Sequence, residues 1–286
     1  MRVEFEPSRE LYPFRSRWFQ ARGIRMHYVD EGSGDPLLMC HGNPTWSFLF
    51  RGMITRLRER FRCIAVDYPG FGLSDRPSGY GYTPAEHAAL VAKLAFEELK
   101  LRRLVVVGQD WGGPIGMATA AGAPERIRGL VFGNTWFWPA DGSMRTFSVV
   151  MSSPPMQWLI KERNFFVEFI IPHGVARPLP PQVMDQYRQA QPNAAARVGV
   201  AEFPRQIRKA RTFLAGLEER APRRLADKPM LLPWGLRDVA FGQRSVIDRW
   251  RRAFPGAEVM ELAGAGHYLW EDEPAAISEA ITGKFG

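Results

Sequence analysis

Short apolar segments that alternate with helical segments are the feature of this sequence that most constrains its fold. The apolar segments show no clean alternation of polar and apolar residues, which is typical of strands buried on both faces. They read DPLLMCHG (35–42), FRCIAVDYPGFG (61–72), LRRLVVVGQD (101–110), IRGLVFGN (127–134), KPMLLPWGLRD (228–238) and AEVMELAGAGH (257–267). The sequence therefore predicts an α/β protein whose mostly parallel sheet is flanked by helices on both faces.

Helical periodicity appears in three segments beside these strands, at residues 46–60, 82–99 and 273–285. The second has a clear start signal. Thr83 is the expected N-cap, Pro84 takes the first helical position and Glu86 completes a capping box. A further segment, GIRMHYVDEG (23–32), alternates between polar and apolar residues and is predicted to be a strand.

The alternation of strands and helices stops near residue 138 and returns near residue 221. Between them lie two proline pairs, at 154–155 and 180–181, and helical stretches such as NFFVEFII (164–171). No segment there has a convincing strand pattern. We predict a main domain at residues 1–137 and 221–286 and an inserted helical cap at residues 138–220, with boundaries good to about four residues.

Composition limits the classes of protein to which this chain can belong. With 286 residues and 45% hydrophobic residues, it can bury a sizeable core. The net charge of +8 is spread over amphipathic segments, without a basic tail or stripe, so we expect no nucleic-acid partner. The N-terminal segment has no apolar signal region and no run is long enough to span a membrane, so we expect a cytoplasmic protein without a membrane partner.

The two cysteines, Cys40 and Cys63, both lie in apolar strand segments. They are expected to be buried free thiols in a reducing compartment. The sequence has no dinucleotide fingerprint, P-loop or zinc-ligand spacing, so no metal or organic cofactor is predicted.

Candidate catalytic residues follow the predicted strands, where catalytic groups of a parallel sheet belong. Asp110 follows LVVV, Asp238 follows MLLPWGLR and His267 follows VMELAGAG, while HGNPTW (41–46) follows PLLMC. Asp110 stands at the centre of GQDWG, where the nucleophile-elbow pattern G-x-S-x-G has a serine. The order nucleophile, acid, histidine is the chain order of an α/β-hydrolase catalytic triad.

Four motifs resemble the haloalkane dehalogenases: HGNPTW (41–46), DYPGFGLSD (67–75), GQDWGG (108–113) and GAGHYLWEDEP (264–274). The resemblance covers nearly the whole chain and implies the α/β-hydrolase fold with a cap. It is closest to the branch with an Asp-His-Asp triad and an Asn-Trp halide-binding pair. Another branch has its acid, a glutamate, after the strand that follows the nucleophile helix. Asn134 stands at that position here, so Asp238 is the expected acid.

An aspartate nucleophile suits displacement of halide from a saturated carbon, because its alkyl ester can be opened by water, whereas a serine would give an inert ether. His267, supported by Asp238, would activate the water. The resemblance implies that Asn43 and Trp111 form the oxyanion hole through their backbone N–H groups and bind the halide through their side chains. The expected partners are therefore a small apolar halogenated substrate, a halide ion and water. Members of the branch tend to form large oligomers, which implies a homo-oligomer.

Aromatic residues are frequent in and beside the predicted cap, where they suit the wall of an apolar pocket, although core packing is the commoner role for any one of them. They are Trp136, Trp138, Phe147, Trp158, Phe165, Phe166 and Phe169. His41 is expected to shape its loop. His27, His87 and His173 match no catalytic role.

Several other functions stay open. An epoxide hydrolase of the same fold also uses an elbow aspartate but activates its substrate with two cap tyrosines, and residues 138–220 contain only Tyr187. Fluoroacetate dehalogenases usually have arginine where Trp111 stands, and coelenterazine-type luciferases have a glutamate in place of Asn134. A non-catalytic small-ligand binding protein is the alternative from another class, but it would have no need for a complete triad.

Overall fold

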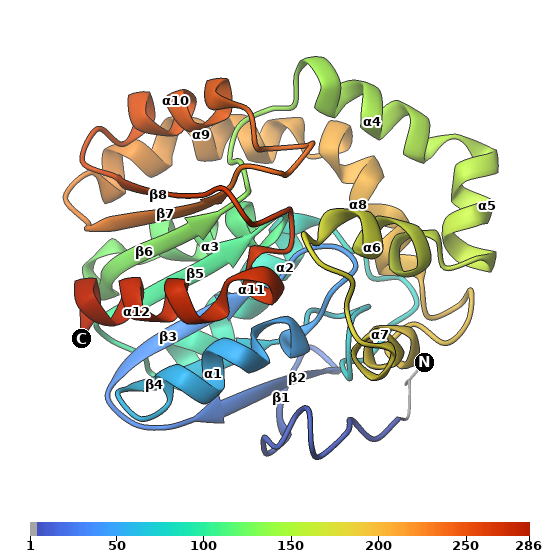
Figure 1. Cartoon of the computed structure of the whole chain (residues 1–286), viewed down its shortest axis with the longest axis horizontal. Helices are drawn as coiled ribbons and strands as arrows, with labels where there is room; N and C mark the ends of the chain where they lie inside the picture. Colours follow the sequence, from blue (N-terminus) through green and yellow to red (C-terminus); the bar gives the residue numbers. More distant parts are fainter. Residues whose placement is uncertain (1–4) are drawn as a thin grey trace.

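The computed structural model describes residues 5–286, and an eight-stranded sheet forms its centre (Figure 1). The strands are β1 (Arg17–Ala21), β2 (Ile24–Glu31), β3 (Asp35–Cys40), β4 (Phe61–Val66), β5 (Leu104–Gln109), β6 (Ile127–Gly133), β7 (Met230–Gly235) and β8 (Glu258–Leu262). Their order across the sheet is β1-β2-β4-β3-β5-β6-β7-β8. Strand β2 pairs antiparallel with β1 and β4, whereas the pairs from β4 to β8 are all parallel.

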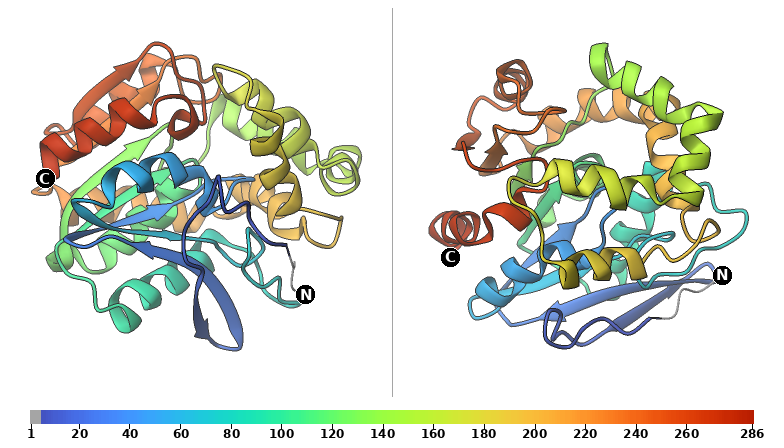
Figure 2. Two further views of the ribbon diagram at one scale, coloured as in Figure 1. Left: turned by 60° about the horizontal axis from the view of Figure 1, so that its bottom comes forward. Right: turned by 45° about the vertical axis from the view of Figure 1, so that its right-hand side comes forward.

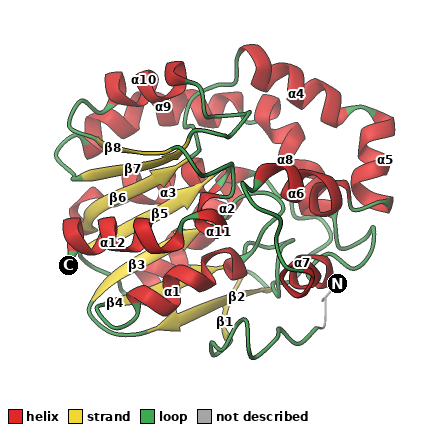
Figure 3. Cartoon of the chain, viewed as in Figure 1, coloured by secondary structure: helices red, strands yellow, loops and turns green. Residues whose placement is uncertain are grey.

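Helices cover both faces of this sheet, as predicted (Figure 3). One face packs against α2 (Pro84–Ala92), α3 (Gly112–Gly122), α9 (Arg211–Leu225) and α10 (Arg244–Ala253), and the other against α1 (Arg51–Leu57) and α12 (Pro274–Phe285). Successive strand residues alternate between these two cores: Leu38 and Val106 belong to the first, Leu37 and Val105 to the second. Because both faces are dry, both sets of positions are apolar, and this explains the continuous apolar strand segments.

The segment between β6 and α9 is helical and lies next to the carboxyl ends of the parallel strands (Figures 1 and 2). It contains α4 (Gly142–Ser152), α5 (Pro154–Glu162), a π-helical segment (Phe166–Ile170), α6 (Ile171–Gly174), α7 (Pro181–Gln189) and α8 (Val198–Lys209). The structure places no strand at residues 138–220, all of which are described. The prediction of a helical insertion is therefore confirmed.

The division into a main domain and a cap stays a proposal, and the packing of α9 bears on its second boundary. The predicted boundary between residues 220 and 221 falls inside α9. This helix packs against α3, which covers the sheet, and its buried residues Leu214, Leu217, Ala221 and Leu225 belong to the core on that face. We propose that the cap ends near residue 210, between α8 and α9.

The local predictions agree with the structure at most strands and helices. The capping box of α2 is present: Thr83 Oγ1 accepts from the Glu86 amide (3.2 Å), and the Glu86 carboxylate accepts from the Thr83 amide (3.1 Å). That helix continues as a π-helical segment (Lys93–Glu98), and a 3-10 turn (Ser47–Phe50) precedes α1. Strand β1, helix α10 and the short helix α11 (Leu269–Asp272) were not among the predicted elements.

Both cysteines are buried free thiols, as predicted. Burial raises the pKa of the Cys40 and Cys63 thiols to about 12, which keeps them protonated at neutral pH. Among the helices of residues 5–286, none combines the length and the apolar character that crossing a membrane requires.

Candidate functional site

Asp110 lies on a tight turn between β5 and α3, in the left-handed backbone conformation with φ of +51°. The turn needs glycine on either side. A Cβ atom at Gly108 would lie 2.4 Å from the carbonyl oxygen of Gly112, and one at Gly113 would lie 1.8 Å from Thr135 Oγ1. That same Thr135 hydroxyl donates to the Asp110 backbone carbonyl at 2.6 Å. The GQDWGG motif therefore forms a nucleophile elbow that projects the Asp110 carboxylate from the sheet.

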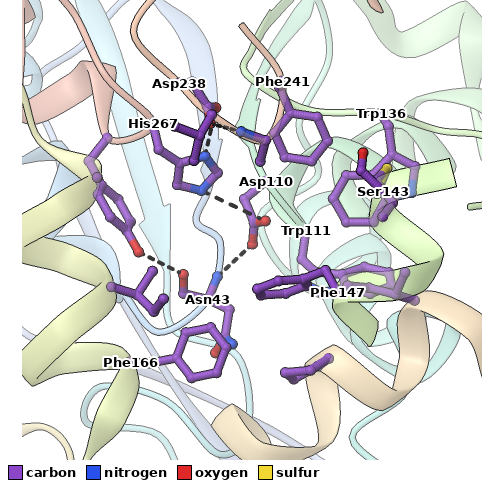
Figure 4. A pocket seen from close by; sticks show the side chains of 18 of the residues that line it. Asn43, Asp110, Trp111, Trp136, Ser143, Phe147, Phe166, Asp238, Phe241 and His267 are labelled. Atoms are coloured by element: carbon purple, nitrogen blue, oxygen red, sulfur yellow. Dashed lines mark hydrogen bonds and ion pairs between the residues drawn. The ribbon is translucent and has the colours of Figure 1, made fainter. Parts of the chain in front are cut away.

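The Asp110 carboxylate is held by a backbone donor on one side and faces a histidine on the other (Figure 4). The Asn43 amide donates to Asp110 Oδ1 at 2.8 Å, while Oδ2 lies 3.9 Å from His267 Nε2. Burial raises the pKa of Asp110, although the charge of His267 and the backbone N–H groups of Asn43 and Trp111 act in the opposite direction. The site thus holds a desolvated carboxylate with one oxygen fixed and the other close to a base.

His267 connects this carboxylate to a second one. Its Nδ1 atom lies 2.8 Å from Asp238 Oδ2, and the Asp238 side chain is almost fully buried. Burial by itself lowers the pKa of His267, but the charge and hydrogen bond of Asp238, with the charge of Asp110, outweigh it and the pKa is raised. The structure therefore brings together Asp110, Asp238 and His267, the three residues that chain order identified as a triad.

Asp238 is itself fixed by donors from two segments. Asn134 Nδ2 donates to Oδ2 at 2.8 Å, and the Ala240 amide donates to Oδ1 at 2.7 Å. Asn134 is locked in turn, because its Oδ1 accepts from the Gly235 amide (2.7 Å) and its Nδ2 donates to the Gly235 carbonyl (2.9 Å). Burial raises the pKa of Asp238, but His267 and these donors overcome it and hold the pKa below its usual value.

A cavity of about 310 Å³ opens above the triad, between the sheet edge and the cap helices. Its wall is mostly apolar and aromatic, so a small apolar molecule would lose little hydration by binding there. The lining residues are Asn43, Asp110, Trp111, Trp136, Ser143, Met144, Phe147, Phe166, Ile170, His173, Gly174, Pro204, Ile207, Asp238, Val239, Ala240, Phe241, His267 and Tyr268.

Asn43 and Trp111, the predicted halide pair, both line this cavity beside Asp110. The Trp111 ring stacks on Phe203 and contacts Trp136 edge to face, which fixes its orientation. Among residues 5–286, no atom accepts a hydrogen bond from the Trp111 indole N–H. The Asn43 amide nitrogen donates one hydrogen to the Val200 carbonyl at 3.2 Å, and its second hydrogen has no such bond within the described chain. Both side chains retain a donor for a ligand.

Of the seven aromatic residues expected near the cap, three line the cavity: Trp136, Phe147 and Phe166. Trp138 packs on Trp250, and the others are not part of the wall.

The remaining histidines fall into two groups. His41 shapes its loop as predicted, since it is buried, contacts the Gly42 carbonyl through Nδ1 (2.8 Å) and accepts from the Tyr68 amide (3.3 Å). His27 and His87 are buried in the main domain. His173, by contrast, lines the cavity, and nothing in its sequence neighbourhood indicated this.

Sequence reasoning also missed Gln109 and Tyr268 as parts of the site. Gln109 Nε2 lies 2.9 Å from His267 Nε2, and the Tyr268 hydroxyl donates to the Asn43 carbonyl at 3.3 Å. Both adjoin a triad residue in the sequence, which was the available signal. No group of three His, Cys, Asp or Glu side chains within residues 5–286 is arranged as a metal site.

Tyr187, the one tyrosine of residues 138–220, is not available to the cavity. Its hydroxyl donates to Glu271 Oε1, and that carboxylate also pairs with Arg51 through two hydrogen bonds (2.5 and 2.7 Å). Tyr187 is absent from the cavity wall, so it cannot activate an epoxide bound above Asp110.

Comparison with known proteins identifies the family of this chain. Residues 35–274 match the family model described as alpha/beta hydrolase fold. Haloalkane dehalogenase 2 of Mycobacterium tuberculosis (strain ATCC 25618 / H37Rv) is 54% identical over 100% of both chains. The cis-3-alkyl-4-alkyloxetan-2-one decarboxylase of Shewanella oneidensis is 33% identical over 95% of this chain and 87% of the relative.

Solved structures of similar shape include haloalkane dehalogenase DatA from Agrobacterium tumefaciens C58, with a TM-score of 0.85 and 25% identity over 97% of this chain and 98% of that one. Haloalkane dehalogenase DbeA from Bradyrhizobium elkani USDA94 has a TM-score of 0.85 and 26% identity over 94% of this chain and 97% of that one. By sequence and by fold, this chain belongs to the haloalkane dehalogenases, a family of enzymes with the alpha/beta hydrolase fold.

Proposed function

We propose that this enzyme converts haloalkanes to a primary alcohol, halide and a proton through a covalent ester on Asp110. One observation carries the proposal: the Asp110 carboxylate stands at the base of an apolar cavity, with a backbone donor on Oδ1 and the His267–Asp238 pair beside Oδ2. A carboxylate placed in this way can both attack a carbon and be regenerated by water.

In the first step, Asp110 Oδ2 attacks the carbon that carries the halogen. The new C–O bond forms as the carbon–halogen bond breaks, and the halide leaves with the bonding electron pair. Negative charge moves from the carboxylate to the halogen, so donors near the halogen lower the barrier. The indole N–H of Trp111 and the side-chain amide of Asn43 are the donors that we assign to this task.

In the second step, His267 Nε2 takes a proton from a water molecule while the water oxygen attacks Cγ of the Asp110 ester. The resulting oxyanion develops on Oδ1, to which the Asn43 amide already donates at 2.8 Å. The Trp111 amide is the second donor that we assign to this oxyanion hole. Asp238 stabilises the imidazolium, and collapse of the intermediate releases the alcohol and restores the carboxylate.

A second candidate activity comes from the oxetan-2-one decarboxylases among the relatives. The name of the Shewanella oneidensis relative indicates a four-membered cyclic ester as its substrate, and that protein also matches this chain over most of its length. The dehalogenase matches at 54% identity rather than 33%, and this difference favours haloalkanes as substrates. The experiment below separates the two.

A variant that cannot open the ester provides the test. His267→Phe removes the base but leaves Asp110 and the halide donors, so incubation with 1-bromohexane is expected to add one hexyl group to the protein. Intact-mass measurement detects the adduct, and peptide mass spectrometry locates it. Parallel incubations contain a terminal epoxide and a cis-dialkyl oxetan-2-one, and an Asp110→Asn/His267→Phe double variant serves as the control.

A hexyl adduct on Asp110 that is absent from the double variant supports the proposed mechanism. Labelling by the epoxide alone would identify an epoxide hydrolase. Consumption of the oxetanone by the unmodified enzyme, without any hexyl adduct in the variant, would favour the second candidate.

A further inference from the structure

The side-chain amide of Gln109 contacts the proposed base at two points. Gln109 is the last residue of β5, immediately before Asp110, and its side chain is fully buried. Gln109 Nε2 donates to the backbone carbonyl of His267 at 3.0 Å and lies 2.9 Å from the ring atom His267 Nε2. One amide group therefore contacts both the backbone and the ring of the same histidine.

The backbone carbonyl determines which way this amide points. A carbonyl oxygen only accepts hydrogen bonds, so the atom 3.0 Å from it must be the amide nitrogen and not the amide oxygen. The same nitrogen, which carries two hydrogens, then faces His267 Nε2. A donor opposite Nε2 requires that Nε2 be an acceptor, which means an unprotonated ring nitrogen. The remaining ring proton is on Nδ1, where it is donated to Asp238 Oδ2 at 2.8 Å.

We propose that Gln109 is a positioning residue that holds resting His267 as a neutral imidazole, with its proton on Nδ1 and its Nε2 lone pair accepting from Gln109 until water takes that place. This inference deepens the proposed function, on which its catalytic meaning rests. Protonation of Nε2 would break the bond from Gln109 and set two donors against each other. Gln109 thus opposes charging of the base before substrate has reacted.

A group that favours the neutral ring is needed because the charged groups around His267 favour its protonated form. Asp238, on the loop after β7, contacts Nδ1, and Asp110, on the elbow, lies 3.9 Å from Nε2. The other titratable groups on this side of the cavity are Tyr268, next in the chain, and His173, on α6. The two carboxylates outweigh burial, and the pKa of His267 is raised. An imidazolium formed too early would pair with Asp110 and could not accept a proton from water.

The unpaired end of the Gln109 amide supports a functional role. Gln109 Oε1 is buried and has no hydrogen-bond partner within residues 5–286. A buried acceptor without a partner costs stability, and an apolar side chain of similar size would avoid that cost. The loss of stability from the unpaired oxygen is explained if the amide nitrogen is needed to position His267.

The ester-opening step gives this contact a defined place in the reaction. Nε2 has one lone pair, so Gln109 must yield it when water arrives. The water proton then goes to Nε2 and its oxygen to Cγ of Asp110. The proton later leaves with the products, and Nε2 again accepts from Gln109.

Nuclear magnetic resonance of the histidine rings tests the proposal without substrate. In protein labelled with 15N-histidine, the unmodified enzyme at a pH above the His267 titration midpoint is expected to show neutral His267 with its proton on Nδ1, and the spectrum of His267→Phe identifies the signals. Gln109→Met keeps the length of the side chain but removes the donor, so the His267 titration midpoint is expected to rise by about half a pH unit or more. Gln109→Glu, which adds a carboxylate, is expected to raise it further.

Gln157→Met is the matched control. Gln157 is also a buried glutamine whose Nε2 donates to two backbone carbonyls, of Met151 and Ala201 (2.8 and 3.0 Å), and whose Oε1 has no partner among the described residues. It lies outside the cavity wall, so its replacement should leave the His267 midpoint unchanged.

Two results would overturn the proposal: a proton on Nε2 in the neutral unmodified enzyme, or an unchanged midpoint in folded Gln109→Met. If Gln109→Met does not fold, Gln109→Glu and the tautomer of the unmodified enzyme decide. These spectra need no turnover, so a missing hexyl adduct would remove the dehalogenation mechanism without changing what the spectra say about Gln109.

Discussion

The carboxylate of Asp238 accepts three hydrogen bonds, from the His267 ring, the Asn134 amide and the Ala240 backbone. Its Oδ2 atom receives two of them, and this leaves no freedom for the side chain to rotate. A carboxylate fixed in this way selects the ring nitrogen of His267 that carries the proton. Asn134 therefore helps to orient the base from two contacts away, although it does not touch the cavity.

Asp238→Asn should stop the second step and spare the first. The new amide nitrogen would favour the wrong tautomer of His267, and a loss of about 10³ to 10⁴ in turnover is expected by analogy with other triads. Halide release in a single turnover should continue while the alkyl-enzyme accumulates. Rapid-quench measurement of halide and protein mass checks this, and unaltered steady-state turnover would leave Asp238 without a catalytic role.

The pH dependence of turnover follows from the raised pKa of His267. Only the neutral imidazole can accept the water proton. The rate of ester opening is therefore maximal above this pKa and decreases as the pH falls through it. The acid limb of kcat should therefore follow the pKa of His267 in the ester intermediate, which Asp238 continues to raise although Asp110 no longer carries a charge there. Single-turnover halide release should be less sensitive over the same range. A kcat profile that stays flat down to pH 5 would contradict this assignment.

Trp111→Phe tests the halide role, since it removes the indole N–H and keeps an aromatic ring. Chloride concentrates its charge more than iodide and depends more on donors, so kcat/KM should fall further for 1-chlorohexane than for 1-iodohexane. Equal losses for the two substrates would assign Trp111 to packing against Phe203 and Trp136 instead.

At the scale of elements, the sequence was most informative where a strand or helix is specified locally. The capping box at Thr83 and the glycines around Asp110 act over a few residues, so they could be recognised in the sequence. The proximity of Asp110, Asp238 and His267 was also predictable, because strand order in this fold converts chain position into spatial position. Gln109 could not be assigned, since its contact with His267 spans 158 residues of sequence. His173 could not be placed at the cavity, since its position depends on how the cap packs.

Three elements distant in sequence meet at Glu271 on α11. Arg51 of α1 pairs with its carboxylate through both terminal nitrogens, and Tyr187 of α7 donates to the same group. The Glu271 side chain is only 5% exposed, so water cannot replace a lost partner. The cluster joins the cap helix α7 to the main domain and to the segment that follows His267.

Arg51→Met should lower the free energy of unfolding by about 3 kcal/mol, because it leaves Glu271 buried without its counter-charge. Arg188→Met is the control: its pair with Glu168 is 42% exposed on both sides and should contribute less than about 1 kcal/mol. Urea unfolding of the two variants provides the measurement. Similar losses in both would show that burial of the Arg51 pair has no special weight.

On the scale of the whole molecule, the reaction depends on where the cap meets the sheet. The proposed nucleophile, acid and base follow strands of the sheet, whereas α4, the π-helical segment and α8 contribute the cap side of the apolar wall, with Met144, Phe147, Phe166, Ile170, Pro204 and Ile207. The sequence could predict both layers but not the cavity between them. The volume of the cavity depends on how the side chains of the two layers pack against each other. We therefore expect the cap side of the wall to influence substrate range, and the residues that follow the strands to carry the proposed chemistry.

This separation predicts that a change in the cap wall alters selectivity without altering the chemical step. Ile207 on α8 is buried and lines the cavity, so Ile207→Trp should shorten the space above Asp110. We expect kcat/KM for 1-bromohexane to fall about tenfold or more relative to bromoethane. An effect of this size is typical when an apolar pocket discriminates between substrates that differ by a few methylene groups. Val198→Trp, at a 37% exposed position on the same helix, is the control and should leave the ratio unchanged. A proportional loss for both substrates in Ile207→Trp would mean that cap and chemistry are coupled, since the barrier itself would then have moved.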